Sequence, residues 1–250
     1  MGTGAAAVRA LLIRGMVAGV AAGLVAFVFA RVVGEPALEG GIAYEDALAT
    51  AAHEHDGEAL VSRATQSGIG LAVAYLVYGV ALGGILGLVH ATAQGRLGGL
   101  GARATALVVA LLGFVAVVLV PFLKYPANPP ASSIDDTIGF RTGAFVLMVA
   151  ASVVVAVGAV AVAGRLAPRV GWWHAVLAGV LGYVVVVGLV GFLLPTVAET
   201  PPDFPAVVLY DFRIASLGGH VVLWAVLAVA FAELVHRGAS SRAGTTRSRR

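Results

Sequence analysis

Residues 105–123 read TALVVALLGFVAVVLVPFL and include no charged side chain. As a helix rising about 1.5 Å per residue, this run is long enough to cross the ~30 Å hydrocarbon core of a bilayer. Other apolar runs of similar length lie at residues 10–33, 69–92, 142–164, 174–194 and 214–235. We therefore predict an all-α, polytopic membrane protein whose six transmembrane helices make up one domain, residues 1–236.

The charges between the apolar runs separate by sign. One set of connections, with the chain ends, holds arginines and no acid: Arg9, Arg14, Arg96, Arg103, Arg165, Arg169, Arg237, Arg242, Arg247, Arg249 and Arg250. The other set holds nearly all the acids: Glu35, Glu39, Glu45, Asp46, Glu54, Asp56, Glu58, Asp135, Asp136, Glu199, Asp203 and Asp211. Because basic loops stay in the cytoplasm, we predict an inner-membrane protein with both termini cytoplasmic and three acidic outer loops. Residues 237–250 are then a basic, disordered cytoplasmic tail.

Composition supports a lipid bilayer as the chain's main partner. Hydrophobic residues make up 60% of the sequence and charged residues 12%, with a mean hydropathy of +0.96. The net charge of +3 comes from the inner loops and the tail, so it indicates orientation rather than nucleic-acid binding. The absence of cysteine excludes disulfides and thiolate metal sites.

Catalytic motifs are missing from the sequence. Lys124 is the only lysine, and no glycine-rich phosphate loop precedes it. Neither His-Glu-x-x-His nor Gly-x-Ser-x-Gly occurs. We therefore expect no enzymatic activity and no permanently bound cofactor.

Two parts of the chain resemble one another in parallel order. Pro129-Pro130 and Phe140-Arg141 recur at one common offset as Pro201-Pro202 and Phe212-Arg213. Each unit is an outgoing span, a proline-rich acidic loop and a returning span that opens with arginine. The first two apolar runs form a similar but less regular unit, with Glu35-Pro36 in its loop and Arg63 before its returning span. The pattern therefore predicts three in–out–in hairpins related by rotation about the membrane normal.

Glycines recur every four residues in the first two runs. They are Gly15, Gly19 and Gly23 in the first run, and Gly79, Gly83 and Gly87 in the second. This spacing places small residues along one helix face, so we predict that the glycines let two helices pack closely in lipid.

Arg63, Arg141 and Arg213 each stand at the outer start of a returning span. We expect them to clamp the outer loops by pairing with acidic residues, and the candidate partners are Glu35, Asp136 and Asp211. Direct contact with an anionic ligand is the alternative.

The first outer loop concentrates metal-ligand side chains: His53, Glu54, His55, Asp56 and Glu58. Imidazole with carboxylate suits cobalt, nickel, zinc or manganese. On a helix His53 and His55 would point about 200° apart, so one ion could bind both only on an extended or turning chain. The alternative is a solvated acidic loop that binds no metal.

His220 lies inside the sixth apolar run, about two turns from Arg213. An ionisable residue within a span is a functional candidate, and we predict a midway metal ligand. A neutral histidine hydrogen-bonded to a neighbouring helix is the alternative.

An ordered set of short motifs resembles a known family. The N-terminal half carries Glu35-Pro36, Ala43-Tyr44-Glu45, the loop histidines, Val61-Ser62-Arg63 and Tyr78-Gly79; the C-terminal half carries the paired prolines and the Phe-Arg pairs. Together they resemble the probable cobalt transporter subunit family, CbtA. The resemblance implies cobalt(2+) uptake linked to cobalamin synthesis, and a small single-span, histidine-bearing companion subunit, CbtB. It also matches His53 and His55 to the family's outer-loop histidines, and Arg63, Arg141 and Arg213 to its arginines at span starts.

Our hypothesis is therefore a membrane transporter subunit for uptake of a divalent transition metal, most consistently cobalt. The acidic outer loops would concentrate the cation, and the loop histidines would replace part of its water shell. One alternative is a non-transporting scaffold for a metal-binding partner subunit. The other is a transporter of small organic anions that uses the three arginines.

Overall fold

The computed structural model describes residues 2–53 and 61–247, and this part of the chain contains helices and no strand. The helices in chain order are α1 (Gly2–Phe29), η1 (Ala30–Gly34), α2 (Glu35–Ala52), α3 (Arg63–Thr65), η2 (Gln66–Gly70), α4 (Leu71–Ala93), α5 (Ala102–Phe114), η3 (Val115–Leu119), α6 (Val120–Lys124), η4 (Asp135–Thr137), α7 (Ile138–Leu193) and α8 (Ala206–Arg247). The prediction of an all-α protein is confirmed.

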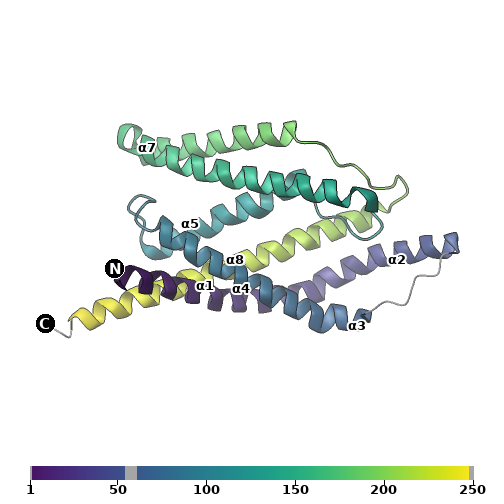
Figure 1. The fold of residues 1–250 in the computed structure, drawn as a ribbon, viewed down its shortest axis with the longest axis horizontal. Helices are drawn as coiled ribbons and strands as arrows, with labels where there is room; N and C mark the ends of the chain where they lie inside the picture. The colour runs from purple at the N-terminus through teal and green to yellow at the C-terminus, as the bar shows by residue number, and fades with distance from the viewer. Residues whose placement is uncertain (1, 54–60, 248–250) are drawn as a thin grey trace.

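Within the described residues, five helical segments are long and apolar enough to cross a membrane. They are Gly4–Ala51, Arg63–Ala93, Ala102–Lys124, Ile138–Leu193 and Ala206–Gly238. The segments run roughly along the long axis of the molecule, and both termini lie at the same end (Figure 1). We call this end, which also holds Arg96 and Arg165, the basic end; the opposite end, with Glu35 and Glu199, is the acidic end.

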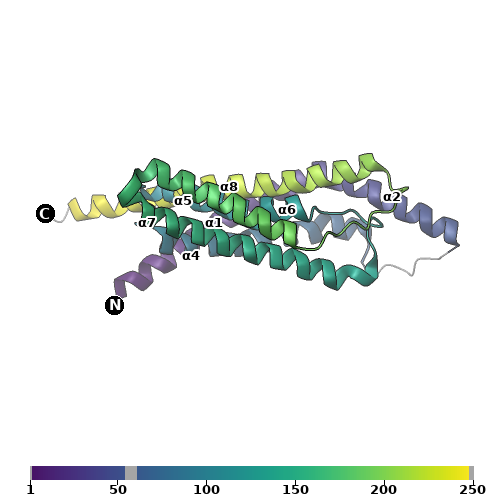
Figure 2. The same ribbon diagram turned by 90° about the horizontal axis from the view of Figure 1, so that it is seen from above.

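The longest segment, α7, combines two of the predicted runs. Its backbone leaves helical geometry at Gly171 (φ 81°, ψ 157°), a conformation that glycine tolerates because it lacks a Cβ. The chain reverses there, and the two arms of α7 lie side by side in both views (Figures 1 and 2). A hydrogen bond of 2.8 Å between the hydroxyls of Ser152 and Tyr183 joins the arms.

The first helix continues beyond residue 33, where the apolar run ends. A π-helical turn, η1, leads directly into α2, and Pro36 follows this turn. A π-turn inside a helix is a place where the regular hydrogen-bond ladder is already interrupted. Glu35-Pro36 therefore marks the end of the apolar stretch and not the end of the helix. Helix α2 projects past the other helices at the acidic end rather than lying across them (Figure 1).

Helices α1 and α4 pack in close antiparallel contact through their glycines. A Cβ built on Gly19 would collide with the backbone oxygen of Gly79, and one built on Gly83 would collide with that of Gly15. At Gly23 the Cβ would lie 2.6 Å from Tyr75 O. The four-residue glycine spacing thus serves backbone contact between these two helices, as the sequence predicts.

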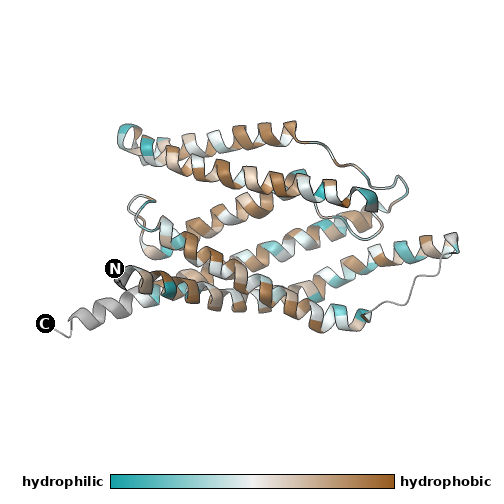
Figure 3. Ribbon diagram, in the orientation of Figure 1, coloured by the Kyte–Doolittle hydropathy of each residue, from teal (hydrophilic) through white to brown (hydrophobic). Residues whose placement is uncertain are grey.

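The core lies among α1, α4, α5 and α8. Its largest fully buried side chains include Leu223, Leu227 and Phe231 of α8, which pack against small residues such as Ala18 and Ala22 of α1. Helix α7 stands at the side of this core. Only 11% of its most apolar stretch is buried inside the molecule, so α7 packs less closely than the core helices. Hydrophobic residues dominate the middle of the helices while hydrophilic residues gather toward their ends (Figure 3). Many large apolar side chains are exposed, as expected for contact with lipid.

Candidate functional site

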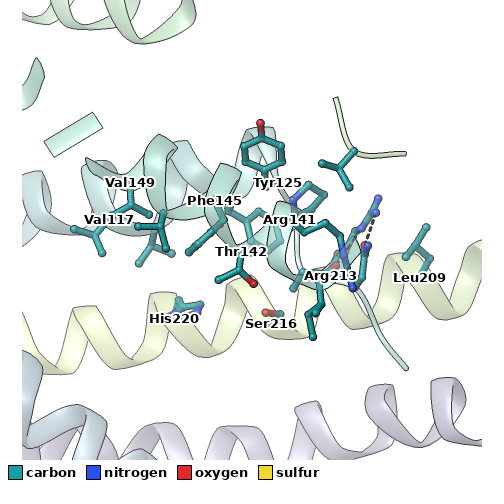
Figure 4. A pocket seen from close by; sticks show the side chains of 18 of the residues that line it. Val117, Tyr125, Arg141, Thr142, Phe145, Val149, Leu209, Arg213, Ser216 and His220 are labelled. Carbon is teal, nitrogen blue, oxygen red and sulfur yellow. Dashed lines mark hydrogen bonds between the residues drawn. The ribbon is translucent and has the colours of Figure 1, made fainter. Parts of the chain in front are cut away.

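A cavity of about 970 Å³ lies toward the acidic end, between the first arm of α7, α8, the η3–α6 segment and two loops. Its wall contains three of the residues that the sequence singles out, namely Arg141, Arg213 and His220. The other polar lining residues are Tyr78, Tyr125, Asn128, Thr142, Thr200 and Ser216. Apolar side chains such as Val117, Phe145 and Val149 make up the rest (Figure 4).

Helical periodicity explains why these side chains meet. Leu209, Arg213, Ser216 and His220 are spaced by four, three and four residues, so they form one stripe along α8. At about 1.5 Å per residue, His220 lies about 10 Å further from the acidic end than Arg213. Thr142 of α7 faces this stripe across the cavity (Figure 4).

Arg141 pairs with Glu199, which lies on the loop before α8. Its Nε atom is 3.4 Å from Glu199 Oε2, and its Nη2 donates to Ile134 O at 3.2 Å. The same Glu199 oxygen accepts a 2.7 Å hydrogen bond from the Thr137 hydroxyl. Asp136, which the sequence suggests as the partner, is an exposed residue of the short helix η4.

Arg213 has neutral partners in the described part of the chain. Its Nη2 donates to Asn128 Oδ1 at 2.9 Å, and its Nε donates to Ala127 O at 3.3 Å. Asp211, the expected partner, is exposed, because residues two apart on a helix point about 200° away from each other. Arg213 thus anchors the loop before η4 by donating hydrogen bonds to two amide oxygens of that loop.

Arg63 lies apart from this cavity. Its Nη2 is 2.6 Å from Oε2 of Glu35, whose side chain is 6% exposed. Glu35 lines a second, smaller cavity of about 200 Å³, together with Tyr75 of α4 and Ser216 of α8. The structure therefore brings Arg141 and Arg213 to one site, and gives Arg63 a separate clamp between α2 and α3.

His220 is partly buried on α8, and the ring of Tyr78 on α4 approaches its own ring edge-on with centroids 6.4 Å apart. Among the residues that the structure describes, none forms a hydrogen bond with the His220 imidazole. The bond to a neighbouring helix that the alternative interpretation requires is thus not seen in this part of the chain.

The first acidic loop is only partly described. His53 is exposed and ends α2 in a left-handed conformation (φ 56°, ψ 25°). Glu54, His55, Asp56 and Glu58 lie outside the described residues. Over residues 2–53 and 61–247, no three His, Asp or Glu side chains are grouped closely enough to hold a metal ion.

The two loops that border the cavity are tied to each other. The Tyr125 hydroxyl donates a 2.7 Å hydrogen bond to Pro195 O. Partial burial raises the pKa of the Tyr125 phenol, so the hydroxyl keeps its proton at neutral pH and remains a donor. This contact and the Thr137–Glu199 hydrogen bond both link the α6–η4 region to the loop between α7 and α8.

A family model described as "Probable cobalt transporter subunit (CbtA)" matches residues 8–236, which is most of the chain. The chain belongs to the CbtA family. Its resemblance to that family, expected from short motifs, is therefore confirmed, and the description is of a transporter subunit rather than an enzyme. No curated protein and no solved structure matches the chain.

As a CbtA-family chain with several apolar helices, this is a multi-pass membrane protein of a cobalt transporter family. Several polar residues of its cavity, among them Asn128, Thr200 and Ser216, were missed from the sequence. Ser216 could have been found, because it lies between Arg213 and His220 at helical spacing. Asn128 and Thr200 could not, because they reach the cavity from loops.

Proposed function

We propose that this chain is the subunit through which cobalt(2+) crosses the inner membrane into the cell. The observation that carries the proposal is the placement of His220: an imidazole without a hydrogen-bond partner among the described residues, in the wall of a cavity between membrane-crossing helices. Neutral imidazole is a ligand that suits cobalt, nickel and zinc. Membership of a cobalt transporter family selects cobalt among these metals.

The acidic loops form the first stage of the proposed path. Carboxylates concentrate cations near the mouth of a protein cleft. His53 and His55, with Glu54, Asp56 or Glu58, replace part of the water shell of the ion before it reaches His220. A small, single-span, CbtB-like companion that carries histidines would deliver the metal to the same loop.

Replacing His53 and His55 together by alanine should lower cobalt accumulation severalfold, because only carboxylate ligands then remain in the loop. The measurement is cellular cobalt content per folded protein in cells that express the double variant. His174→Ala is the matched control, since His174 is exposed on the second arm of α7, outside the cavity. Unchanged accumulation in the double variant would show that the loop is a solvated linker that supplies no metal ligand.

The proposed orientation has six spans, with each arm of α7 crossing once, and both termini in the cytoplasm. It is supported by the separation of arginines and acids between the two ends of the molecule. Residues 237–250 then form a basic cytoplasmic tail.

Cysteine labelling tests this orientation. Thr50 and Gly99 are exposed and lie at the acidic and the basic end, respectively. In intact cells an impermeant thiol reagent should label Thr50→Cys and should leave Gly99→Cys unlabelled until the cells are opened. Labelling of Gly99→Cys in intact cells would contradict the proposed orientation, because the basic end would then face the outside. Ser132, on the loop between α6 and η4, would be a poor site for this labelling because it is fully buried.

A non-transporting scaffold for a metal-binding partner is the competing function. A scaffold requires the fold of this chain but not the imidazole of His220. Variants that keep the fold and remove this imidazole therefore separate the two functions.

A further inference from the structure

The cavity wall carries more positive than negative charge, because Glu199 pairs with Arg141 whereas the described partners of Arg213 are neutral. Arg141 and Arg213 both line it, and no Asp or Glu among the described residues does. A bare divalent cation would be repelled by the guanidinium group of Arg213 on its way to His220. The cavity therefore favours a ligand that presents negative charge at its acidic end.

We propose that this cavity binds a small di- or tricarboxylate, either free or as an anionic complex with the metal. The second form rests on the proposed function in cobalt uptake. The shared chemistry is a compact group of carboxylates held by Arg141 and Arg213.

Arg213 is the better placed of the two groups. Its described partners, Asn128 Oδ1 and Ala127 O, are neutral, so its positive charge is not cancelled. These contacts fix the planar guanidinium at the cavity wall. A fixed guanidinium recognises a carboxylate strongly, because parallel N–H donors match the two oxygens.

Arg141 is the second guanidinium group of the wall, and its hydrogen bonding within the described residues is incomplete. Its Nε is buried and forms no hydrogen bond, although Glu199 Oε2 is 3.4 Å away. The same Glu199 oxygen, Oε2, also accepts a hydrogen bond from the hydroxyl of Thr137. The pair therefore leaves Arg141 incompletely satisfied beside the cavity.

The rest of the wall fits a chelate better than a bare ion. The volume of about 970 Å³ matches sites for small organic ligands and far exceeds the space that one ion needs. The hydroxyls of Thr142 and Ser216 lie between the arginines and His220 (Figure 4). A metal–polycarboxylate complex could meet the arginines with its carboxylates while its metal faces the imidazole.

The test is binding of citrate and of succinate to the purified full-length protein in detergent, with and without cobalt. We expect saturable binding to the wild type and at least tenfold weaker binding to Arg213→Gln. The control, Arg169→Gln, also removes one positive charge, but from the basic end, and should bind like the wild type. Arg213→Lys keeps the charge and loses the planar fork, so it should show intermediate affinity.

The cobalt arms distinguish the two sources of carboxylate. If the metal complex is the ligand, cobalt should tighten citrate binding, and His220→Ala should remove that gain alone. If the free acid is the ligand, cobalt should leave the affinity unchanged; both results support a carboxylate site. Absence of saturable binding to the wild type, or equal binding to Arg213→Gln, would overturn it. Cobalt accumulation by cells expressing the wild type would still uphold the proposed function in that case, whereas citrate binding without cobalt accumulation would remove only that function.

Discussion

Replacing His220 by alanine should lower cobalt accumulation by at least about tenfold without unfolding the protein. Among the residues that the structure describes, His220 is the one histidine that lines the cavity. After its loss, the hydroxyls of Thr142 and Ser216 remain, and these are poor ligands for cobalt. The size of the effect is a lower bound, because changes that only support a metal ligand cost about 10–100-fold in affinity or activity.

The measurement is the cobalt content of cells that express equal amounts of folded protein. His174→Ala provides the matched control, because it removes an exposed imidazole from the same chain. Thermal melting in detergent should show that both variants keep the wild-type fold. Full accumulation by a folded His220→Ala protein would favour the scaffold function.

Replacing Gly83 by valine should cause a large loss of stability. Even a Cβ at this position would collide with the backbone oxygen of Gly15, and a backbone atom cannot move aside as a side-chain rotamer can. Overpacking typically costs about 1–3 kcal/mol, and forced separation of α1 from α4 should reach or exceed the top of that range. The loss is then visible as a lower melting temperature and a lower yield of monodisperse protein.

Gly182→Val is the control for this experiment. A Cβ at Gly182, on the second arm of α7, would meet no atom within 4 Å. This substitution should leave the melting temperature close to that of the wild type. Equal losses in the two variants would mean that glycine is needed for some property other than α1–α4 contact.

Local patterns in the sequence predicted the helical, membrane-type character of the chain well. The apolar runs and the separation of charges follow from the chemistry of a bilayer, and the structure confirms an all-helical chain with its charged residues toward the ends. The glycine repeats correctly indicated close helix packing. The six spans, their three-hairpin arrangement and the metal-binding role of the first acidic loop stay predictions.

Breaks in the helices were harder to predict. The first apolar run was expected to end at residue 33, yet the π-turn η1 joins α1 to α2 and the helix continues past Pro36. Conversely, a loop was expected between residues 164 and 174, but Gly171 alone reverses the chain. Both outcomes depend on backbone geometry that hydrophobicity does not encode.

The partners of the arginines required the three-dimensional structure. Sequence neighbours suggested Asp136 for Arg141 and Asp211 for Arg213. The structure instead places Glu199 beside Arg141 and Asn128 beside Arg213, and both come from loops distant in the sequence. Helix geometry excludes the nearer acid in the case of Arg213, because residues two apart do not share a face.

The central claim is that cobalt passes through this chain, and the uptake of cobalt by vesicles that contain the purified protein tests it most directly. Cobalt should be supplied both as the free ion and with citrate, and the protein should be reconstituted with and without a histidine-bearing companion subunit. We predict uptake faster than in protein-free vesicles in at least one of these conditions, and its loss in vesicles that contain His220→Ala. Wild-type uptake equal to that of protein-free vesicles in every condition would contradict the account.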